Sequence, residues 1–358
     1  MITLVLTNRN RDLRIIKNCL DSLEKQSNKN FELFFVDYGS NENYLLDLEK
    51  VISEYVKIKF ISCPVSGQLW NKSRAINIAL KKCTTPFFMV GDIDLIFAPH
   101  FISTVTSLMK DNEVHYFQYG FLSQKESLKG KIFESYVVDF KGSQEVTGTT
   151  SFPTSILKEM QGYDEFYHGW GAEDTDIHLR MKNFGLEVKF YDKETVVKHQ
   201  WHPKQYRSKF STYPFHSCLE RINHAYMILT KDLKRTVVNQ NQDWGKESNE
   251  EDYKKLNSHS LNEIVIQNSQ IEISAVLAQL KNFKNELISL RIEEATLKSR
   301  NKNKLKRIFR KKSISFIEME EVNNLFLEEI IKNYRNLPYQ FSFDRKKKKI
   351  QLKMYFSQ

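Results

Sequence analysis

The first 97 residues alternate short apolar runs with stretches that have the spacing of amphipathic helices. The predicted strands are Ile2–Leu6, Phe31–Val36, Val56–Ser62 and Pro86–Val90. The predicted helices between them are Leu13–Leu23, Tyr44–Tyr55 and Asn71–Lys82. Strands that alternate with helices in this way form βαβ units. We therefore predict an α/β fold with a mainly parallel sheet covered by helices on both faces.

Polar clusters follow three of these strands at the point where each strand ends. They are Thr7–Arg11, Asp37–Ser40 and Asp92–Asp94. In parallel sheets, ligands bind outside the carboxyl ends of the strands. The three clusters are therefore predicted to form one binding edge.

Asp92 and Asp94 stand one residue apart after the apolar run that ends at Val90. In an extended backbone they point to the same side, so we expect them to face one site if the strand continues. Two such carboxylates repel each other unless a cation lies between them. A divalent ion carrying a nucleotide diphosphate fits this requirement, because hard cations prefer oxygen ligands. An ordinary Gly-Asp turn is the alternative interpretation.

A second chemical stretch is Gly169–Asp176, which leads into a predicted helix over Ile177–Phe184. The two glycines that flank Trp170 make a turn in which the indole can lie against the apolar face of a sugar ring. Acidic residues at a helix start also complement the helix dipole, which explains some of them without any function. That explanation does not account for the Gly-Trp-Gly sequence.

His199 and His202 follow an apolar run, Val196-Val197, in the same half of the chain. Two histidines three residues apart are either metal ligands or polar surface residues. The sequence alone leaves both interpretations open.

The region after residue 244 differs from the rest in charge. Of the net charge of +10, residues 245–358 contribute +8, from 23 Lys and Arg against 15 Asp and Glu. We predict a catalytic domain over 1–244 and a basic, mainly helical region over 245–358. Apolar residues at heptad spacing over 269–297 indicate either a coiled coil that forms a homo-oligomer or a helix packed within its own domain. A second helix is predicted over Ile317–Tyr334.

Two basic runs lie in this region, Lys298–Lys312 and Arg345–Lys349. The first carries nine Lys and Arg and no acidic residue, which is typical of a segment that contacts anionic headgroups at a membrane surface. Nucleic acid is the competing partner. No recognisable nucleic-acid-binding fold accompanies the charge, so we do not expect it.

No apolar run approaches the roughly 20 residues of a membrane span. The four cysteines are scattered without metal or disulfide spacing. We expect a cytoplasmic protein with peripheral contact at the inner face of the cell membrane.

Over about residues 1–240, the chain resembles GT-A glycosyltransferases of the family 2 type. Its second half resembles the catalytic segment of β-1,4-galactosyltransferases and bacterial chondroitin polymerases. The motifs that carry the resemblance are Thr7-Asn8-Arg9, Val36–Ser40, Arg74–Ala79, Asp92-Ile93-Asp94, Gly169–Asp176 and His199. The resemblance implies a GT-A fold, a UDP-sugar donor, and Mn²⁺ or Mg²⁺.

Position by position, the resemblance implies that Thr7, Arg9 and Asp37 hold the uracil and ribose. It implies that Arg74 and Asn77 contact the nucleotide or the donor.

For the metal side, the resemblance places Asp92 near the ribose or the donor sugar and makes Asp94 a direct metal ligand. His199 completes the metal site, and His202 is the second choice for that role.

On the acceptor side, Asp174 aligns with the general base, while Trp170 and Glu173 align with acceptor-sugar contacts. Thr175 stands where the galactosyltransferases have another acidic residue, which weakens any assignment of the acceptor sugar.

The expected reaction is transfer of a sugar, with the galacto series favoured, from a UDP-sugar to a hydroxyl of a glycan or lipid-linked glycan. One base and one metal on opposite sides of the reacting carbon predict a single displacement with inversion. The setting would be surface polysaccharide synthesis. The alternatives are a sugar-1-phosphate nucleotidylyltransferase and a silent scaffold or nucleic-acid-binding protein acting through its basic tail.

Overall fold

The computed structural model describes residues 1–203, 217–256 and 263–357, with side chains between 217 and 221 excluded. It divides into two compact units. The first comprises 1–63, 70–203 and 220–247, and the second is formed mainly by 64–69 and the described residues after 247. The short segment 64–69, which no sequence pattern had singled out, thus belongs with the C-terminal part of the chain.

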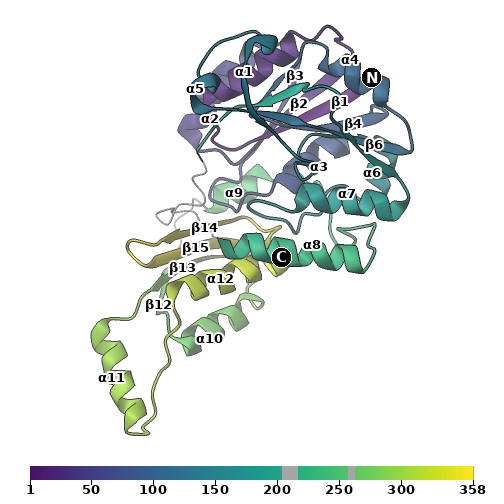
Figure 1. Ribbon diagram of the computed structural model, residues 1–358. Coiled ribbons are helices and arrows are strands. Elements are labelled where there is room, and N and C mark those ends of the chain that lie inside the picture. The colour runs from purple at the N-terminus through teal and green to yellow at the C-terminus, as the bar shows by residue number, and fades with distance from the viewer. Residues whose placement is uncertain (204–216, 257–262, 358) are drawn as a thin grey trace. The chain divides into compact units, whose positions relative to one another are not determined.

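A seven-stranded sheet forms the centre of the first unit (Figure 1). In spatial order its strands are β10 (Glu187–Tyr191), β6 (Glu113–Phe117), β9 (Thr150–Pro153), β4 (Phe87–Asp92), β1 (Ile2–Asn8), β2 (Phe31–Tyr38) and β3 (Ile58–Cys63). Strand β9 runs antiparallel to both neighbours, and the other pairs are parallel. The predicted α/β fold with a mainly parallel sheet is therefore confirmed.

Helices connect these strands. They are α1 (Leu13–Glu24), α2 (Glu42–Ser53), α3 (Lys72–Lys82), α4 (Phe101–Leu108), α5 (Gln124–Ser127), α6 (Thr154–Glu159), α7 (Glu173–Phe184) and α8 (Ser217–Asp232), with a 3₁₀ turn at Phe133–Ser135. The core between sheet and helices is apolar, as burial of Leu4, Phe35 and Met89 shows. Asn71 accepts a hydrogen bond from the Arg74 amide and so caps α3. Helix α7 begins four residues earlier than predicted.

A second, smaller sheet brings distant segments together. Its order is β5 (Leu95–Phe97), β11 (Val197–His199), β7 (Tyr119–Leu122) and β8 (Val138–Lys141). Because β11 pairs with β5, His199 lies opposite Leu95, next to Asp94. The amide of Gln200 also donates to the carbonyl of Asp94, at 2.8 Å. This small sheet, which the sequence pattern did not predict, positions the histidine segment beside the end of β4.

The second unit contains a four-stranded sheet beside its helices, which the prediction of a mainly helical region did not include. Its strands in order are β12 (Glu263–Gln267), β13 (Glu286–Glu293), β15 (Lys349–Phe356) and β14 (Tyr339–Asp344). Its helices are α9 (Glu250–Leu256), α10 (Gln270–Leu280), α11 (Leu297–Ile308) and α12 (Met319–Glu329), the last continued by a π turn, Ile330–Tyr334. The predicted second tail helix is confirmed.

The heptad pattern over 269–297 does not form one helix, so the coiled-coil hypothesis is wrong. Helix α10 ends at Leu280, and Asn285 takes a positive φ of 52° before β13 begins. The reason is that part of the same segment also has the two-residue alternation of a β-strand. Ile288, Leu290 and Ile292 alternate with more polar positions and are buried, which is the pattern of a strand.

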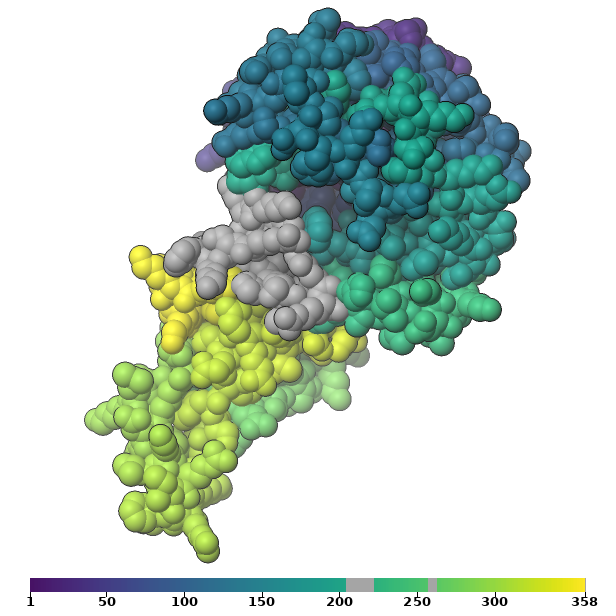
Figure 2. All heavy atoms as spheres, in the orientation of Figure 1, coloured from purple at the N-terminus to yellow at the C-terminus, as the bar shows by residue number. Residues whose placement is uncertain are grey.

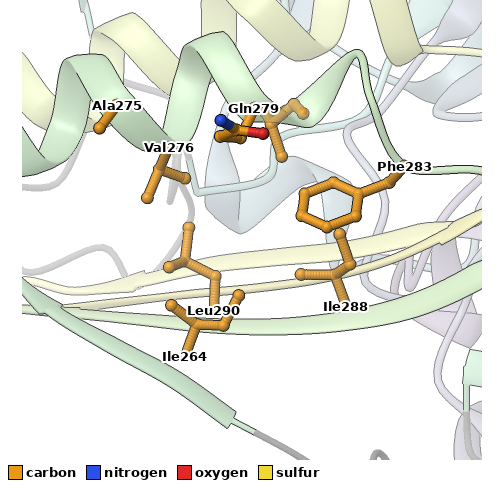
Figure 3. Close-up of a pocket in the computed structure, with 8 residues that line it drawn as sticks. Ile264, Ala275, Val276, Gln279, Phe283, Ile288 and Leu290 are labelled. Carbon is orange, nitrogen blue, oxygen red and sulfur yellow. The ribbon is translucent and has the colours of Figure 1, made fainter.

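An apolar pocket of about 200 Å³ lies in this unit between α10 and the strands β12 and β13 (Figure 3). Val276 and Phe283 reach it from the α10 side, and Ile264 and Leu290 from the strands. Gln279 is the one polar side chain in its lining. The pocket carries no titratable group.

Among the described helices, none combines the length and the hydropathy that crossing a bilayer requires. The thiols of Cys19, Cys63 and Cys83 are free and buried, while Cys218 lies outside the described side chains.

Candidate active site

The carboxyl ends of β1, β2 and β4 meet as predicted. In the sheet register, Thr7 lies opposite Asp92 on one side, and Asn8 lies opposite Asp37 on the other. The Asn8 amide donates to Asp37 Oδ1 at 2.7 Å, which ties the ends of β1 and β2 together. The three polar clusters therefore form one edge of the sheet.

Arg9 and Asp37 are held rigidly at this edge. The Arg9 Nε donates to the carbonyl of Tyr38 at 2.6 Å, and its guanidinium lies over the rings of Tyr38 and Trp70. Asp37 is buried and accepts hydrogen bonds from Asn8 and from both the amide and the hydroxyl of Ser40. Burial raises the pKa of Asp37, and these hydrogen bonds oppose the shift.

Asn77 has a structural role, and the prediction that it contacts the nucleotide is wrong. Its side chain is fully buried, and its amide donates to Tyr163 O and to Glu165 Oε1. Its oxygen accepts from the amide of Tyr163. Arg74, predicted for the same role, pairs with Glu165 at 2.8 Å and is nearly buried. Both residues anchor the segment that leads to Gly169.

Asp92 and Asp94 do not face the same partners, which corrects the expectation from strand geometry. Strand β4 ends at Asp92 and the backbone turns at residues 93 and 94. Asp92 binds Lys72 at 3.0 Å and accepts a hydrogen bond from the Tyr119 hydroxyl at 2.7 Å. Gly148 leaves room for this arrangement, since a Cβ there would lie 2.3 Å from Asp92 Oδ2.

Asp94 lies in a cluster with both histidines. Its carboxylate is 3.5 Å from His199 Nε2 and 3.1 Å from His202 Nε2, and one ligand atom from each residue lies within 4.8 Å of the others. Arg11 approaches the same carboxylate at 3.2 Å. Asp94 Oδ1 is buried and accepts no hydrogen bond from the described residues. The sequence named His199 first and His202 second, and the structure brings both together.

The electrostatics of this cluster suit a cation. Burial raises the pKa of Asp94, but His199, His202 and Arg11 outweigh it, so the net pKa is well below the usual range. Burial lowers the pKa of His199, although Asp94 opposes the shift. A carboxylate oxygen and a neutral imidazole nitrogen are both donors to divalent metals.

Lys72, the first residue of α3, connects Asp92 to Asp174. Its ammonium lies 2.9 Å from Asp174 Oδ2, 3.0 Å from Asp92 Oδ1 and 3.9 Å from Glu173 Oε1. Burial would lower the pKa of Lys72, but the three carboxylates outweigh burial and raise it well above its usual value. Sequence reasoning missed this residue, because nothing distinguishes it from the other cations until α3 and α7 are brought together.

Asp174 is the second residue of α7, and its side chain is 16% exposed. Burial raises its pKa to about 8; Lys72 opposes this shift, while Glu173 and Asp92 add to it. Its Oδ1 is buried and accepts no hydrogen bond from the described part of the chain. One oxygen of the carboxylate is thus held by Lys72, and the other has no hydrogen-bond donor among the described residues.

The Gly-Trp-Gly turn presents its indole outward. Gly169, Gly171 and Ala172 have φ values of 78°, 94° and 78°, a conformation that glycine adopts without a steric cost but alanine does not. The amide of Asn223 on α8 holds the turn through three carbonyls, that of Gly171 among them at 3.2 Å. Trp170 is 53% exposed.

The residues of this site lie within segments that match known protein families. Residues 3–154 match the family model described as glycosyl transferase family 2, and residues 130–203 match the one described as the N-terminal domain of galactosyltransferase. Over 94 residues the chain is 32% identical to a teichoic acid poly(glycerol phosphate) polymerase of Staphylococcus epidermidis. That match spans 26% of this chain and 12% of the polymerase.

Similar solved structures include S. aureus TarS 1–349 in complex with UDP-GlcNAc, with a TM-score of 0.48 and 16% identity, covering 65% of this chain and 69% of that one. They also include the mannosyltransferase PcManGT of Pyrobaculum calidifontis with GDP-Man and Mn²⁺, with a TM-score of 0.43 and 16% identity, covering 65% and 63%. The family 2 match contains the three strand ends, and the galactosyltransferase match contains the Gly-Trp-Gly turn and both histidines. Residues 3–203 of this chain are therefore covered by two glycosyltransferase family matches, the family 2 model over residues 3–154 and the galactosyltransferase model over residues 130–203, on the mainly parallel α/β sheet described above.

Proposed function

We propose that this chain is a metal-dependent, inverting glycosyltransferase that moves a sugar from a UDP-sugar to a hydroxyl group of a glycan acceptor. The observation that carries the proposal is the pairing of two groups at one edge of the sheet. Asp94 belongs to a cluster with two histidines, and Asp92, two residues earlier, is bridged through Lys72 to Asp174. A cation site at Asp94 and a proton acceptor at Asp174 would thus be connected through Asp92 and Lys72.

Asp94, His199 and His202 are the residues that would hold the metal. Asp94 Oδ1, which accepts no hydrogen bond from the described residues, and the short distances between the three side chains support this assignment. Two imidazole nitrogens favour a transition ion, so Mn²⁺ fits this donor set better than Mg²⁺, which prefers oxygen ligands. When bound, the ion would act as a Lewis acid that neutralises the charge of the departing diphosphate.

Asp174 is the proposed general base. A pKa of about 8 lies close to neutral pH, where a base combines a useful ionised fraction with a strong affinity for the proton. As the acceptor oxygen bonds to the anomeric carbon, Asp174 would take its proton, and the bond from that carbon to the diphosphate oxygen would break. Attack from the face opposite the leaving group gives inversion.

The remaining contacts follow the same arrangement. We assign Thr7, Arg9 and Asp37 to the uridine, since they lie at the ends of β1 and β2. Asp92 would lie beside the ribose or the donor sugar. We assign Trp170 to the apolar face of the acceptor sugar because its indole is exposed beside α7.

The acceptor is proposed to be a surface polysaccharide or its lipid-linked precursor. The match to a teichoic acid polymerase supports this setting, although the chain spans only about an eighth of that protein. A donor of the galacto series is favoured by the match of residues 130–203 to the galactosyltransferase model.

The proposal is tested by measuring donor binding and hydrolysis over a panel of UDP-sugars, with Mn²⁺, with Mg²⁺ and with chelator. We expect preference for one UDP-sugar, with activity that requires metal and is higher with Mn²⁺. The anomeric configuration of the product, followed by NMR, should be opposite to that of the donor. A folded protein that binds no UDP-sugar in the presence of metal would contradict the proposal and favour a non-catalytic scaffold.

Replacing Lys72 with methionine is expected to move the pH profile of kcat/KM to higher pH. The ammonium stabilises the ionised form of Asp174, so its loss raises the pKa of that carboxyl further above about 8. Below the pKa, the fraction of base falls tenfold per pH unit, so activity at pH 7 should fall while alkaline activity is partly kept.

Lys72→Arg, which keeps the charge, should restore most of the original profile, and the exposed Lys125→Met serves as a control for loss of one lysine. A lower rate with an unchanged pH profile would mean that Lys72 acts on the fold or on the donor and does not tune Asp174.

A further inference from the structure

Helix α11 has an unusual distribution of side chains. Leu297, Leu305 and Ile308 are 77%, 56% and 66% exposed, and Phe309, which caps the helix, is 69% exposed. At about 100° per residue, the three aliphatic side chains fall within one sector of about 80°. A surface helix normally buries such a stripe against its own core.

The opposite side of α11 is polar and faces the protein. Asn303, about 160° away from the middle of the apolar sector, is 8% exposed and accepts a hydrogen bond from the Ile314 amide at 2.9 Å. Arg300, beside it, pairs with Glu294 at 2.9 Å. The polarity of α11 is thus reversed, with its apolar side outward. The helix is part of the light-green segment at the lower left of Figure 2.

Basic side chains flank the exposed apolar sector. The run Lys298–Lys312 contains nine Lys and Arg and no acidic residue. Several of these side chains are exposed; they are Lys298, Lys302, Lys304, Arg307, Arg310, Lys311 and Lys312. An exposed apolar stripe bordered by cations matches the boundary between anionic headgroups and acyl chains.

We propose that α11 is an in-plane membrane anchor that inserts Leu305, Ile308 and Phe309 between anionic lipid headgroups. The lysines and arginines of the helix would bind the headgroup phosphates and carboxylates. Nucleic acid would satisfy the charges but not the apolar side chains, which is why lipid is the favoured partner. The inference concerns the second unit and is independent of the proposed chemistry in the first.

The test is co-sedimentation of the full chain with vesicles of phosphatidylcholine alone or with added phosphatidylglycerol. We expect binding that requires phosphatidylglycerol and weakens as salt rises. Lys302→Gln with Lys304→Gln should lower the partition coefficient by about fivefold per charge. Lys346→Gln with Lys347→Gln, at the exposed turn between β14 and β15, removes the same charge and should have the smaller effect.

The apolar contribution is tested with Ile308→Ser and Phe309→Ser together, which keep every charge. We expect this variant to lose most of its vesicle binding while its thermal melting stays unchanged, because both side chains are exposed. Full retention of vesicle binding by this variant would overturn insertion. Absence of vesicle binding combined with salt-dependent binding to a DNA or RNA duplex would overturn the lipid assignment in favour of nucleic acid.

Discussion

Replacing Asp174 with asparagine is expected to lower the rate of glycosyl transfer by about 10²- to 10⁴-fold, the contribution typical of a positioned general base. Asparagine keeps the size and shape of the side chain but cannot take the proton of the acceptor hydroxyl. Lys72 keeps its ion pair with Asp92 at 3.0 Å, so the local charge is not left unpaired. The measurement is kcat for transfer to acceptor under saturating donor and metal.

Donor binding separates loss of chemistry from loss of structure. Asp174→Asn should bind UDP-sugar with nearly unchanged affinity and melt at nearly the temperature of the parent protein. Asp111→Asn, at an exposed turn of the same unit, serves as a matched control with unchanged activity. Near-normal transfer by Asp174→Asn would show that another group accepts the proton.

The fold of the first unit could be predicted because its local and global signals agree. Strand Ile2–Asn8, for example, is buried along its whole length and is mainly apolar, and a polar turn follows it. The helix predicted over Asn71–Lys82 is observed as α3, with Asn71 as its N-cap residue. What no local signal revealed was the small sheet that pairs β11 with β5, since it joins residues about a hundred positions apart.

The second unit shows why a coiled coil was wrongly considered for residues 269–297. Residues 269–297 contain both the heptad spacing of a helix and the two-residue alternation of a strand. Leu287 and Leu290 fit the heptad spacing, although they belong to strand β13. The alternation of Ile288, Leu290 and Ile292 would have indicated β13. The segment forms a strand because it pairs with β15, which lies about sixty residues further along the chain.

For the candidate site, sequence reasoning identified residues better than it identified their partners. Asp94 and both histidines were named, and the structure brings them together. Asn77 was misassigned because its position in a motif says nothing of its burial, which depends on packing against Tyr163. Lys72 was missed for the same reason, as its role exists only once α3 lies beside α7.

Replacing Asp94 with asparagine is expected to abolish metal-dependent activity, with a loss of at least the roughly 10²- to 10³-fold that removal of one preorganised electrostatic contact costs. The amide has no charge, so it cannot offset a divalent ion or the repulsion from Arg11, which lies 3.2 Å from this carboxylate. Titration with Mn²⁺ alone, followed by EPR or calorimetry, measures the loss without relying on turnover.

Variants of the two histidines test which imidazoles bind the metal together with Asp94. Because His199 and His202 both lie within reach of Asp94, His199→Ala and His202→Ala should each weaken Mn²⁺ binding. His100→Ala, which removes an exposed histidine paired with Glu194, should leave Mn²⁺ affinity unchanged. If only one of the two variants weakens binding, the other histidine is not a ligand, and the site reduces to Asp94 and a single imidazole. If Asp94→Asn itself binds Mn²⁺ as the parent does, the metal does not use this cluster, and Asp94 serves only to hold Arg11 and the histidine segment in place.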